Sequence, residues 1–219
     1  MNTRFAIYLL VILIAFLKGV SRYKRLDTPF KYLTIMVGYS FFSELSTRFM
    51  AHYLHTSMPA YHLICVVHFV LLSLIYHHLI KSNSIKKVIV LLIVPFVIIA
   101  IVNTLIFQHF TTTLPSNAIL LSQIIYVIYS LLLFRQMLLN LNFTPLSKQG
   151  IFWFNISVFV DSSVTGLYLG LINYFNAHNI DTTLLDNIIY GSSIIFYSFF
   201  GIALFLTNKK IPEEYPYAR

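Results

Sequence analysis

Charged residues are scarce in this sequence. Asp, Glu, Lys and Arg make up 10% of its 219 residues, whereas a soluble globular domain carries about a quarter. Acidic residues are the scarcest, with 7 against 15 Lys and Arg, while hydrophobic residues make up 58% of the chain. This composition excludes an ordinary soluble domain and is typical of a protein embedded in a membrane.

Cysteine and the common catalytic motifs are also missing. The single cysteine, Cys65, excludes an internal disulfide and any site built from several cysteines. Every lysine lies at the boundary of an apolar run, so no lysine could form a retinal Schiff base, and we expect no resident cofactor. Neither an HExxH zinc motif nor a GxSxG nucleophile motif is present.

Seven apolar runs are long enough to cross a bilayer, since a transmembrane helix needs about 20 residues. The loops between them are short and leave no room for a second domain. The sequence therefore predicts an all-α, polytopic membrane protein with one domain over residues 1–219. The expected spans are 4–20, 30–54, 60–81, 86–108, 116–138, 150–173 and 186–207.

Basic residues alternate from loop to loop and so predict the orientation of the chain. Thirteen of the 15 Lys and Arg lie at the first, third and fifth loops or in the tail, leaving Arg4 and the intramembrane Arg48. Cytoplasmic loops are enriched in Lys and Arg. We therefore expect the amino terminus outside, the carboxyl terminus in the cytoplasm, and a location in a bacterial inner membrane. The same pattern explains the net charge of +8 without a nucleic-acid partner.

Charged residues inside apolar spans mark a candidate site, because they are costly in a bilayer and usually face a bundle interior or a cavity. Glu44 and Arg48 are four residues apart and share a helix face, either as a site or as a pair that neutralises itself. His68 is expected at a depth similar to Glu44, since its helix runs the opposite way from the same turn. A hydrogen-bonded packing role is the alternative for His68.

The sixth expected span carries Asp161 near its middle. Ser162, Gly166 and Gly170 follow at spacings of four, a small-residue face that predicts close approach of another helix. If the helices close into one bundle, convergent polar groups in an apolar wall would form a small-molecule site. The candidate ligand-binding residues are Glu44, Arg48, His68, Gln123, Asp161, Tyr168 and Tyr190.

Three stretches resemble a family of uncharacterised seven-helix integral membrane proteins of Bacteroidota. They are SFFSELSTRFMAHYL, HLICVVHFVLLSLIYHHLI and TPLSKQGIFWFNISVFVDSS. In that family a Pro-Leu segment precedes a Phe-Trp pair entering the sixth helix, here Pro145, Leu146, Phe152 and Trp153. A carboxylate in the second helix would correspond to Glu44. The resemblance implies a membrane sensor or accessory protein working beside a histidine kinase. The chain differs from the family at Asp161, where a Tyr- or Phe-rich stretch with Gly is more usual.

Three functions fit these residues. The first is a receptor-like protein that binds a small ligand or lipid in an outward-facing cavity, with Arg48 holding an anionic group and Glu44 and Asp161 holding donors or protons. Only about a dozen residues follow Thr207, so we expect its signal to pass to a membrane partner such as a histidine kinase. The second is a structural subunit of a membrane complex. The third is a lipid-modifying enzyme, in which a metal, if one is bound, would be held by Glu44, His68 and Asp161.

Overall fold

The computed structural model describes residues 3–139, 145–178 and 180–207, and these residues form seven long α-helices joined by short turns. Lys209, Lys210 and Arg219, which the orientation argument also used, lie outside the described residues. The helices are α1 (Thr3–Arg22), α2 (Thr28–Tyr53), α3 (Met58–Leu79), α4 (Asn83–Val102), α5 (Ser116–Leu139), α6 (Gly150–Ala177) and α7 (Thr183–Leu206).

Each expected span corresponds to one of these helices. Six of them are long and apolar enough to cross a membrane: α1, α3, α4, α5, α6 and α7. The chain is therefore a multi-pass helical membrane protein. Helix α2 does not meet the same hydropathy criterion, because it carries Lys31, Glu44 and Arg48 among several hydroxyl residues. At 26 residues it is nevertheless about 39 Å long, which matches the membrane-spanning helices beside it.

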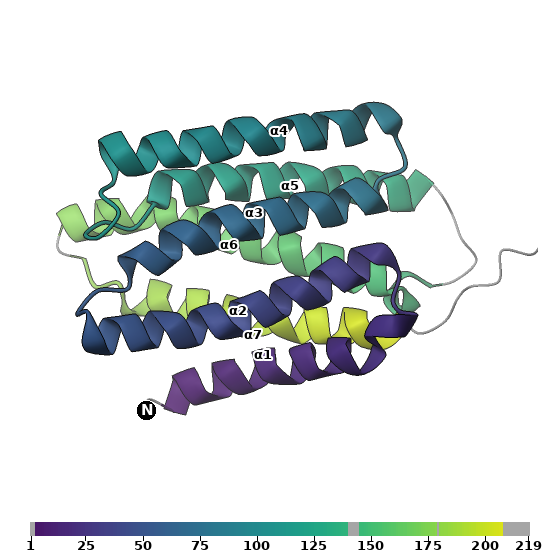
Figure 1. Ribbon diagram of the computed structural model, residues 1–219, viewed down its shortest axis with the longest axis horizontal. Helices are drawn as coiled ribbons and strands as arrows, with labels where there is room; N and C mark the ends of the chain where they lie inside the picture. Colours follow the sequence, from purple (N-terminus) through teal and green to yellow (C-terminus); the bar gives the residue numbers. More distant parts are fainter. Residues whose placement is uncertain (1–2, 140–144, 179, 208–219) are drawn as a thin grey trace, which may run out of the picture.

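The helices run roughly antiparallel to their sequence neighbours in two layers (Figure 1). One layer holds α4, α3, α2 and α1 side by side, and the other holds α5, α6 and α7. Contacts between α1 and α7 close the bundle, and α2 also contacts α7 across the layers. The amino terminus lies at the same end as the α2–α3, α4–α5 and α6–α7 turns. Side chains from α1, α3 and α6, as well as from α2 and α7 themselves, can therefore face the region between α2 and α7.

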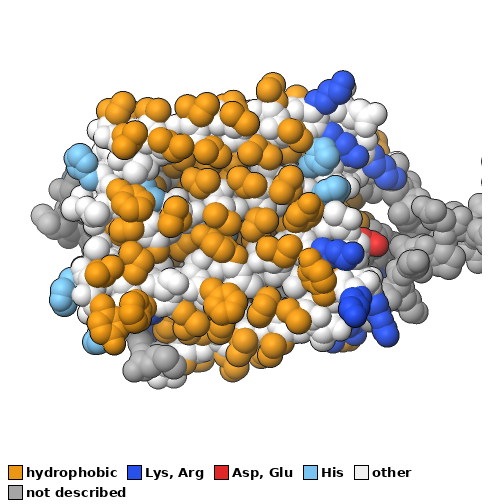
Figure 2. All heavy atoms as spheres, in the orientation of Figure 1, with side chains coloured by type: hydrophobic (Ala, Val, Ile, Leu, Met, Phe, Trp, Pro, Cys, Tyr) orange, Lys and Arg blue, Asp and Glu red, His pale blue; other side chains and the backbone are white. Residues whose placement is uncertain are grey.

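The interior is packed with aromatic and aliphatic side chains, while the outer surface is apolar as well. Phe69 of α3 is fully buried, and its ring stacks on Phe96 of α4 with centroids 3.6 Å apart. On the outside, Leu91 and Leu105 are each 72% exposed. Figure 2 shows hydrophobic side chains over the middle of one face, with Lys and Arg gathered at one end. An apolar belt of this kind suits hydrocarbon rather than water.

Close helix contacts occur at glycines other than the predicted ones. A Cβ at Gly19 of α1 would come within 2.5 Å of Thr34 Oγ1, and a Cβ at Gly38 of α2 within 2.5 Å of the Phe16 ring. At Gly166 the nearest atom would be the Gln123 Cβ at 3.9 Å, and at Gly170 nothing lies within 4 Å. The expectation of close approach is therefore wrong at Gly170, whereas at Gly166 a Cβ would be in ordinary contact with α5, and Ser162 is buried. Spacing alone does not say whether a small-residue face meets a helix or lipid.

Candidate functional site

Glu44 of α2 is held by a tyrosine from the first helix. The Tyr8 hydroxyl of α1 donates a 3.0 Å hydrogen bond to Glu44 Oε1. Glu44 as a whole residue is half-buried. This contact gives the intramembrane charge a polar partner, which a carboxylate in an apolar span requires.

His68 of α3 faces α2. Its Nε2 atom lies 3.0 Å from Ser40 Oγ, and Ser40 is buried. The Ser40 hydroxyl donates its single hydrogen to the Met36 carbonyl at 2.9 Å, so His68 Nε2 is assigned as the donor to Ser40. The ring of Tyr39 meets the imidazole edge-on, with centroids 5.8 Å apart. These contacts fix the orientation of a half-buried imidazole.

Asp161 of α6 is held from the last helix. The Ser192 hydroxyl of α7 donates a 3.1 Å hydrogen bond to Asp161 Oδ1. Ser192 is buried, while Asp161 keeps part of its surface accessible. One oxygen of the Asp161 carboxylate is therefore hydrogen-bonded to the neighbouring helix α7.

Tyr197 of α7 lies beside these contacts. It is 5% exposed, its ring meets Tyr8 edge-on with centroids 5.7 Å apart, and its hydroxyl interacts with Ser40 and Tyr8. The charges of Glu44 and Asp161 both act on the same hydroxyl. We call this group the central cluster, and it brings together three of the predicted site residues. Its members are Tyr8, Ser40, Glu44, His68, Asp161, Ser192 and Tyr197.

Arg48 lies at the edge of the central cluster. It is exposed one helical turn beyond Glu44, and its guanidinium carbon is 4.1 Å from the centroid of the Phe5 ring. Its charge acts on Glu44 and on the Tyr61 hydroxyl. A cation held over an aromatic face is stabilised while its donors remain oriented toward the surroundings.

The other three predicted residues lie elsewhere. The Tyr190 hydroxyl donates to the Arg4 carbonyl at 2.9 Å, and the Tyr168 hydroxyl donates to Asp186 Oδ1 at 3.1 Å. Both contacts are exposed. Gln123 of α5 packs beside Gly166, and its Oε1 atom is buried without a hydrogen-bond partner among the described residues. None of these contacts joins Gln123, Tyr168 or Tyr190 to the central cluster.

Sequence reasoning missed Tyr8, Ser40, Ser192 and Tyr197. Their types give weak signals, since a hydroxyl inside a span is commonly satisfied by its own helix backbone. Ser40 does make such a bond, to Met36. Tyr8 and Tyr197 carry the clearer signal, because a buried tyrosine hydroxyl needs a partner that its own helix rarely supplies.

The geometry also bears on metal chemistry. Within residues 3–139, 145–178 and 180–207, no group of three His, Cys, Asp or Glu side chains is placed to hold a metal ion. Glu44, His68 and Asp161 are each hydrogen-bonded to a different hydroxyl, from Tyr8, Ser40 and Ser192 respectively. The arrangement is therefore suited to hydrogen bonding and to charge stabilisation, rather than to three-ligand coordination.

The chain matches no protein-family profile, and no curated protein or solved structure shows significant similarity to it.

Proposed function

We propose that this chain is a receptor-like protein of a bacterial inner membrane that binds a small ligand at the central cluster. The observation that supports this most is the meeting of Glu44, Asp161 and the His68–Ser40 pair around the Tyr197 hydroxyl. Each of Glu44, His68 and Asp161 is half-buried and is oriented by a hydrogen bond to one hydroxyl. A few convergent polar groups within an apolar wall are characteristic of small-molecule sites.

The two carboxylates favour a ligand with a positively charged group or several hydrogen-bond donors. Glu44 and Asp161 supply acceptor oxygens, each already oriented by one hydroxyl. Arg48 lies at the edge, where it would hold an anionic group on the same ligand. A small zwitterionic or donor-rich molecule fits this charge distribution better than a purely anionic one.

In the orientation we propose, the amino terminus is outside and the basic end of the bundle faces the cytoplasm. The end with the α1–α2, α3–α4 and α5–α6 connections carries the gathered Lys and Arg (Figure 2). This asymmetry supports the orientation through the preference of basic loops for the cytoplasm. All seven helices, α2 included, then span the membrane. A ligand-dependent rearrangement would reach a partner, such as a histidine kinase, through the basic end.

The proposal is tested by asking whether a small molecule stays bound to the protein during purification. The full chain is purified gently from its membrane and analysed by native mass spectrometry, with Asp161→Asn and Glu44→Gln as site variants and Asp186→Asn as a matched carboxyl-to-amide control. We expect a bound small molecule on the wild type and on Asp186→Asn, with about tenfold lower occupancy on both site variants, because each loses a charge-assisted contact. Equal occupancy on all four proteins would overturn the proposal.

A structural subunit of a membrane complex is the second candidate. It is favoured by the pairing of Glu44 with Tyr8 and of Asp161 with Ser192, since polar pairs across helices also serve packing. Under this function, Glu44→Gln would lower assembly with a partner protein, and the purified wild type would carry no small molecule. A lipid-modifying enzyme would use the same side chains as acid and base. Turnover of a lipid, lost on Asp161→Asn, would be its signature.

A further inference from the structure

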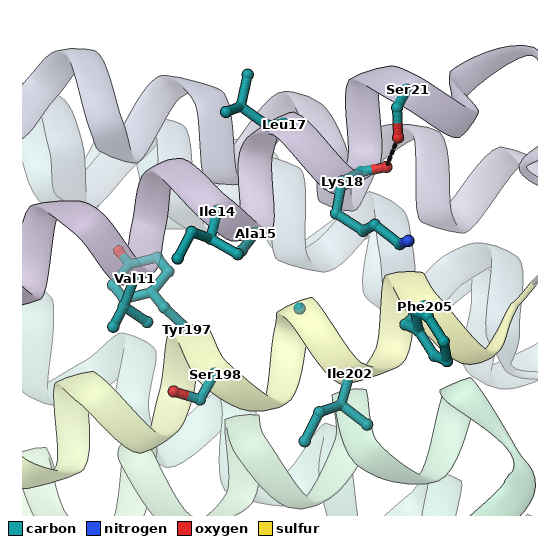
Figure 3. A pocket seen from close by; sticks show the side chains of 11 residues that line it. Val11, Ile14, Ala15, Leu17, Lys18, Ser21, Tyr197, Ser198, Ile202 and Phe205 are labelled. Carbon is teal, nitrogen blue, oxygen red and sulfur yellow. Dashed lines mark hydrogen bonds between the residues drawn. The ribbon is translucent and has the colours of Figure 1, made fainter.

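A groove on the membrane-facing side of the bundle runs between α1 and α7. It has a volume of about 670 Å³ and a mainly apolar lining that includes Val11, Ile14, Ile202 and Phe205. Figure 3 shows Val11 and Tyr197 at one end of this α1–α7 groove, and Lys18 facing Phe205 at the other. The Lys18 ammonium lies 4.6 Å from the centroid of the Phe205 ring. The groove is therefore apolar along its length and positively charged at one end.

A second, basic pocket continues from that charged end. It has a volume of about 540 Å³ and is lined by Ser21, Arg22, Lys24 and Arg25, together with Val20. Ser21 lines both the groove and this pocket, so the two adjoin at this residue. Arg22 also donates a 2.7 Å hydrogen bond to the Phe205 carbonyl, which fixes the end of α7 beside the charges.

We propose that the α1–α7 groove and the basic pocket together bind one anionic phospholipid. An acyl chain would lie along the apolar lining, and the phosphate would lie among Lys18, Ser21, Lys24 and Arg25 at the basic end. A zwitterionic lipid offers the same acyl chain but carries a cation that these side chains repel. Basic pockets between membrane helices are suited to anionic headgroups for this reason. This site shares only Tyr197 with the central cluster, and it does not rest on the function proposed above.

One residue connects the lipid site with the rest of the protein. Tyr197 lines the groove, while its hydroxyl belongs to the central cluster. A chain in the groove would pack against the same tyrosine that Glu44 and Asp161 act on. Lipid binding would therefore hold Tyr197 in place from the membrane side.

The test measures lipid preference on the full chain in nanodiscs containing equal amounts of phosphatidylglycerol and phosphatidylcholine. Native mass spectrometry counts the lipids retained by the wild type, Lys18→Gln and the double variant Lys24→Gln/Arg25→Gln. Lys86→Gln/Lys87→Gln is the matched control, because these lysines lie at the start of α4 and line a different pocket. We expect wild type and control to prefer phosphatidylglycerol, and the preference to fall about fivefold for each charge removed at the proposed site.

A second pair of variants tests the acyl-chain part. Ile14→Trp would fill the α1–α7 groove, whereas Leu10→Trp places the same side chain on the membrane-facing surface of α1 away from the lining. We expect lower phosphatidylglycerol retention for Ile14→Trp alone, with unchanged thermal unfolding of both variants. No preference in the wild type, equal losses in the α4 control, or no effect of Ile14→Trp would each overturn the proposal. Retention that persists in Asp161→Asn would confirm that lipid binding does not need the Asp161 carboxylate, whereas its loss there would contradict the proposal.

Discussion

The Tyr8 hydroxyl and the Glu44 carboxylate, 36 positions apart in the chain, are joined by a 3.0 Å hydrogen bond between the first and second helices. The same tyrosine ring packs edge-on against Tyr197 of the last helix. Tyr8 of α1 therefore contacts both α2 and α7. Its hydroxyl orients the Glu44 carboxylate, while its ring packs in the apolar interior.

The bond between Tyr8 and Glu44 is expected to couple the two residues energetically. Tyr8→Phe should lower the free energy of unfolding by about 0.5–2 kcal/mol, the range for a hydrogen bond between membrane helices. In a Glu44→Met background the same substitution should cost little, because the acceptor is gone. Unfolding in a denaturing detergent measures all four proteins of this cycle. Additive effects of the two substitutions would contradict the coupling.

Tyr76 should matter more to stability than to ligand binding. It is fully buried, its hydroxyl lies 2.7 Å from Ser130 Oγ and donates to Asn155 Oδ1 at 3.0 Å, and so it joins α3, α5 and α6. Tyr76→Phe leaves these buried groups without that partner and should cost about 1–3 kcal/mol. Tyr53→Phe is the control, since Tyr53 is 63% exposed. Equal thermal midpoints for the two variants would refute the importance of this contact.

Two glycines of α6 should respond oppositely to alanine. A Cβ at Gly150 would lie 2.6 Å from the Ala203 carbonyl oxygen, and a backbone atom cannot easily move away. Gly150→Ala should therefore destabilise the bundle by about 1–3 kcal/mol through overpacking. Gly170→Ala meets nothing within 4 Å and should be neutral or stabilising by up to about 1 kcal/mol, from better helix propensity. Thermal unfolding measures the stability of both variants. Equal effects would show that α6 and α7 are less closely packed at Gly150 than this distance implies.

Asp181 should make stability depend on pH at the start of α7. The hydroxyl and backbone N–H of Thr183 both donate to Asp181 Oδ1, at 2.6 and 2.9 Å, and they hold the pKa of this exposed carboxyl below its usual value. A lowered folded-state pKa gives stability that is present above the unfolded value of about 4 and is lost as pH falls through the folded value. Asp181→Ala should thus lower the thermal midpoint at pH 7, with the difference shrinking at acid pH.

Asp27 supplies the control for that experiment. Asp27 is the N-cap residue of α2, whereas Asp181 precedes Thr182, the N-cap residue of α7. Asp27 makes no side-chain capping hydrogen bond within the described part of the chain. Asp27→Ala should leave the midpoint nearly unchanged across the pH range. A pH-independent loss for Asp181→Ala would show that the effect comes from the backbone and not from the carboxylate.

The proposed orientation can be checked with single cysteines, because the native Cys65 is buried and can be replaced by alanine. Thr112→Cys lies in the exposed α4–α5 turn, and Lys87→Cys lies at the opposite, basic end. A membrane-impermeant maleimide should label Thr112→Cys in intact bacterial cells, and Lys87→Cys only after the cells are opened. The reverse pattern would invert the orientation and place the central cluster's outer edge in the cytoplasm.

The class of protein and the positions of its helices follow from the amino-acid sequence alone. Long apolar runs must satisfy their backbone within the bilayer, and a helix does so without help from other segments. For this reason the expected spans correspond to the observed helices, including 30–54 for α2 and 116–138 for α5. The sequence also predicts similar depths in the membrane for Glu44 and His68 from their positions along these runs.

Which polar side chains meet depends on how the helices pack, because the position of a residue along a helix does not say which way its side chain faces. Rotation and packing of five helices brought Tyr8, Ser40, Ser192 and Tyr197 to Glu44, His68 and Asp161. The same packing left Tyr168 and Tyr190 in exposed contacts and turned Gly170 away from any neighbour within 4 Å. Contacts between α1 and α7 join opposite ends of the sequence, and they also form the groove beside Lys18.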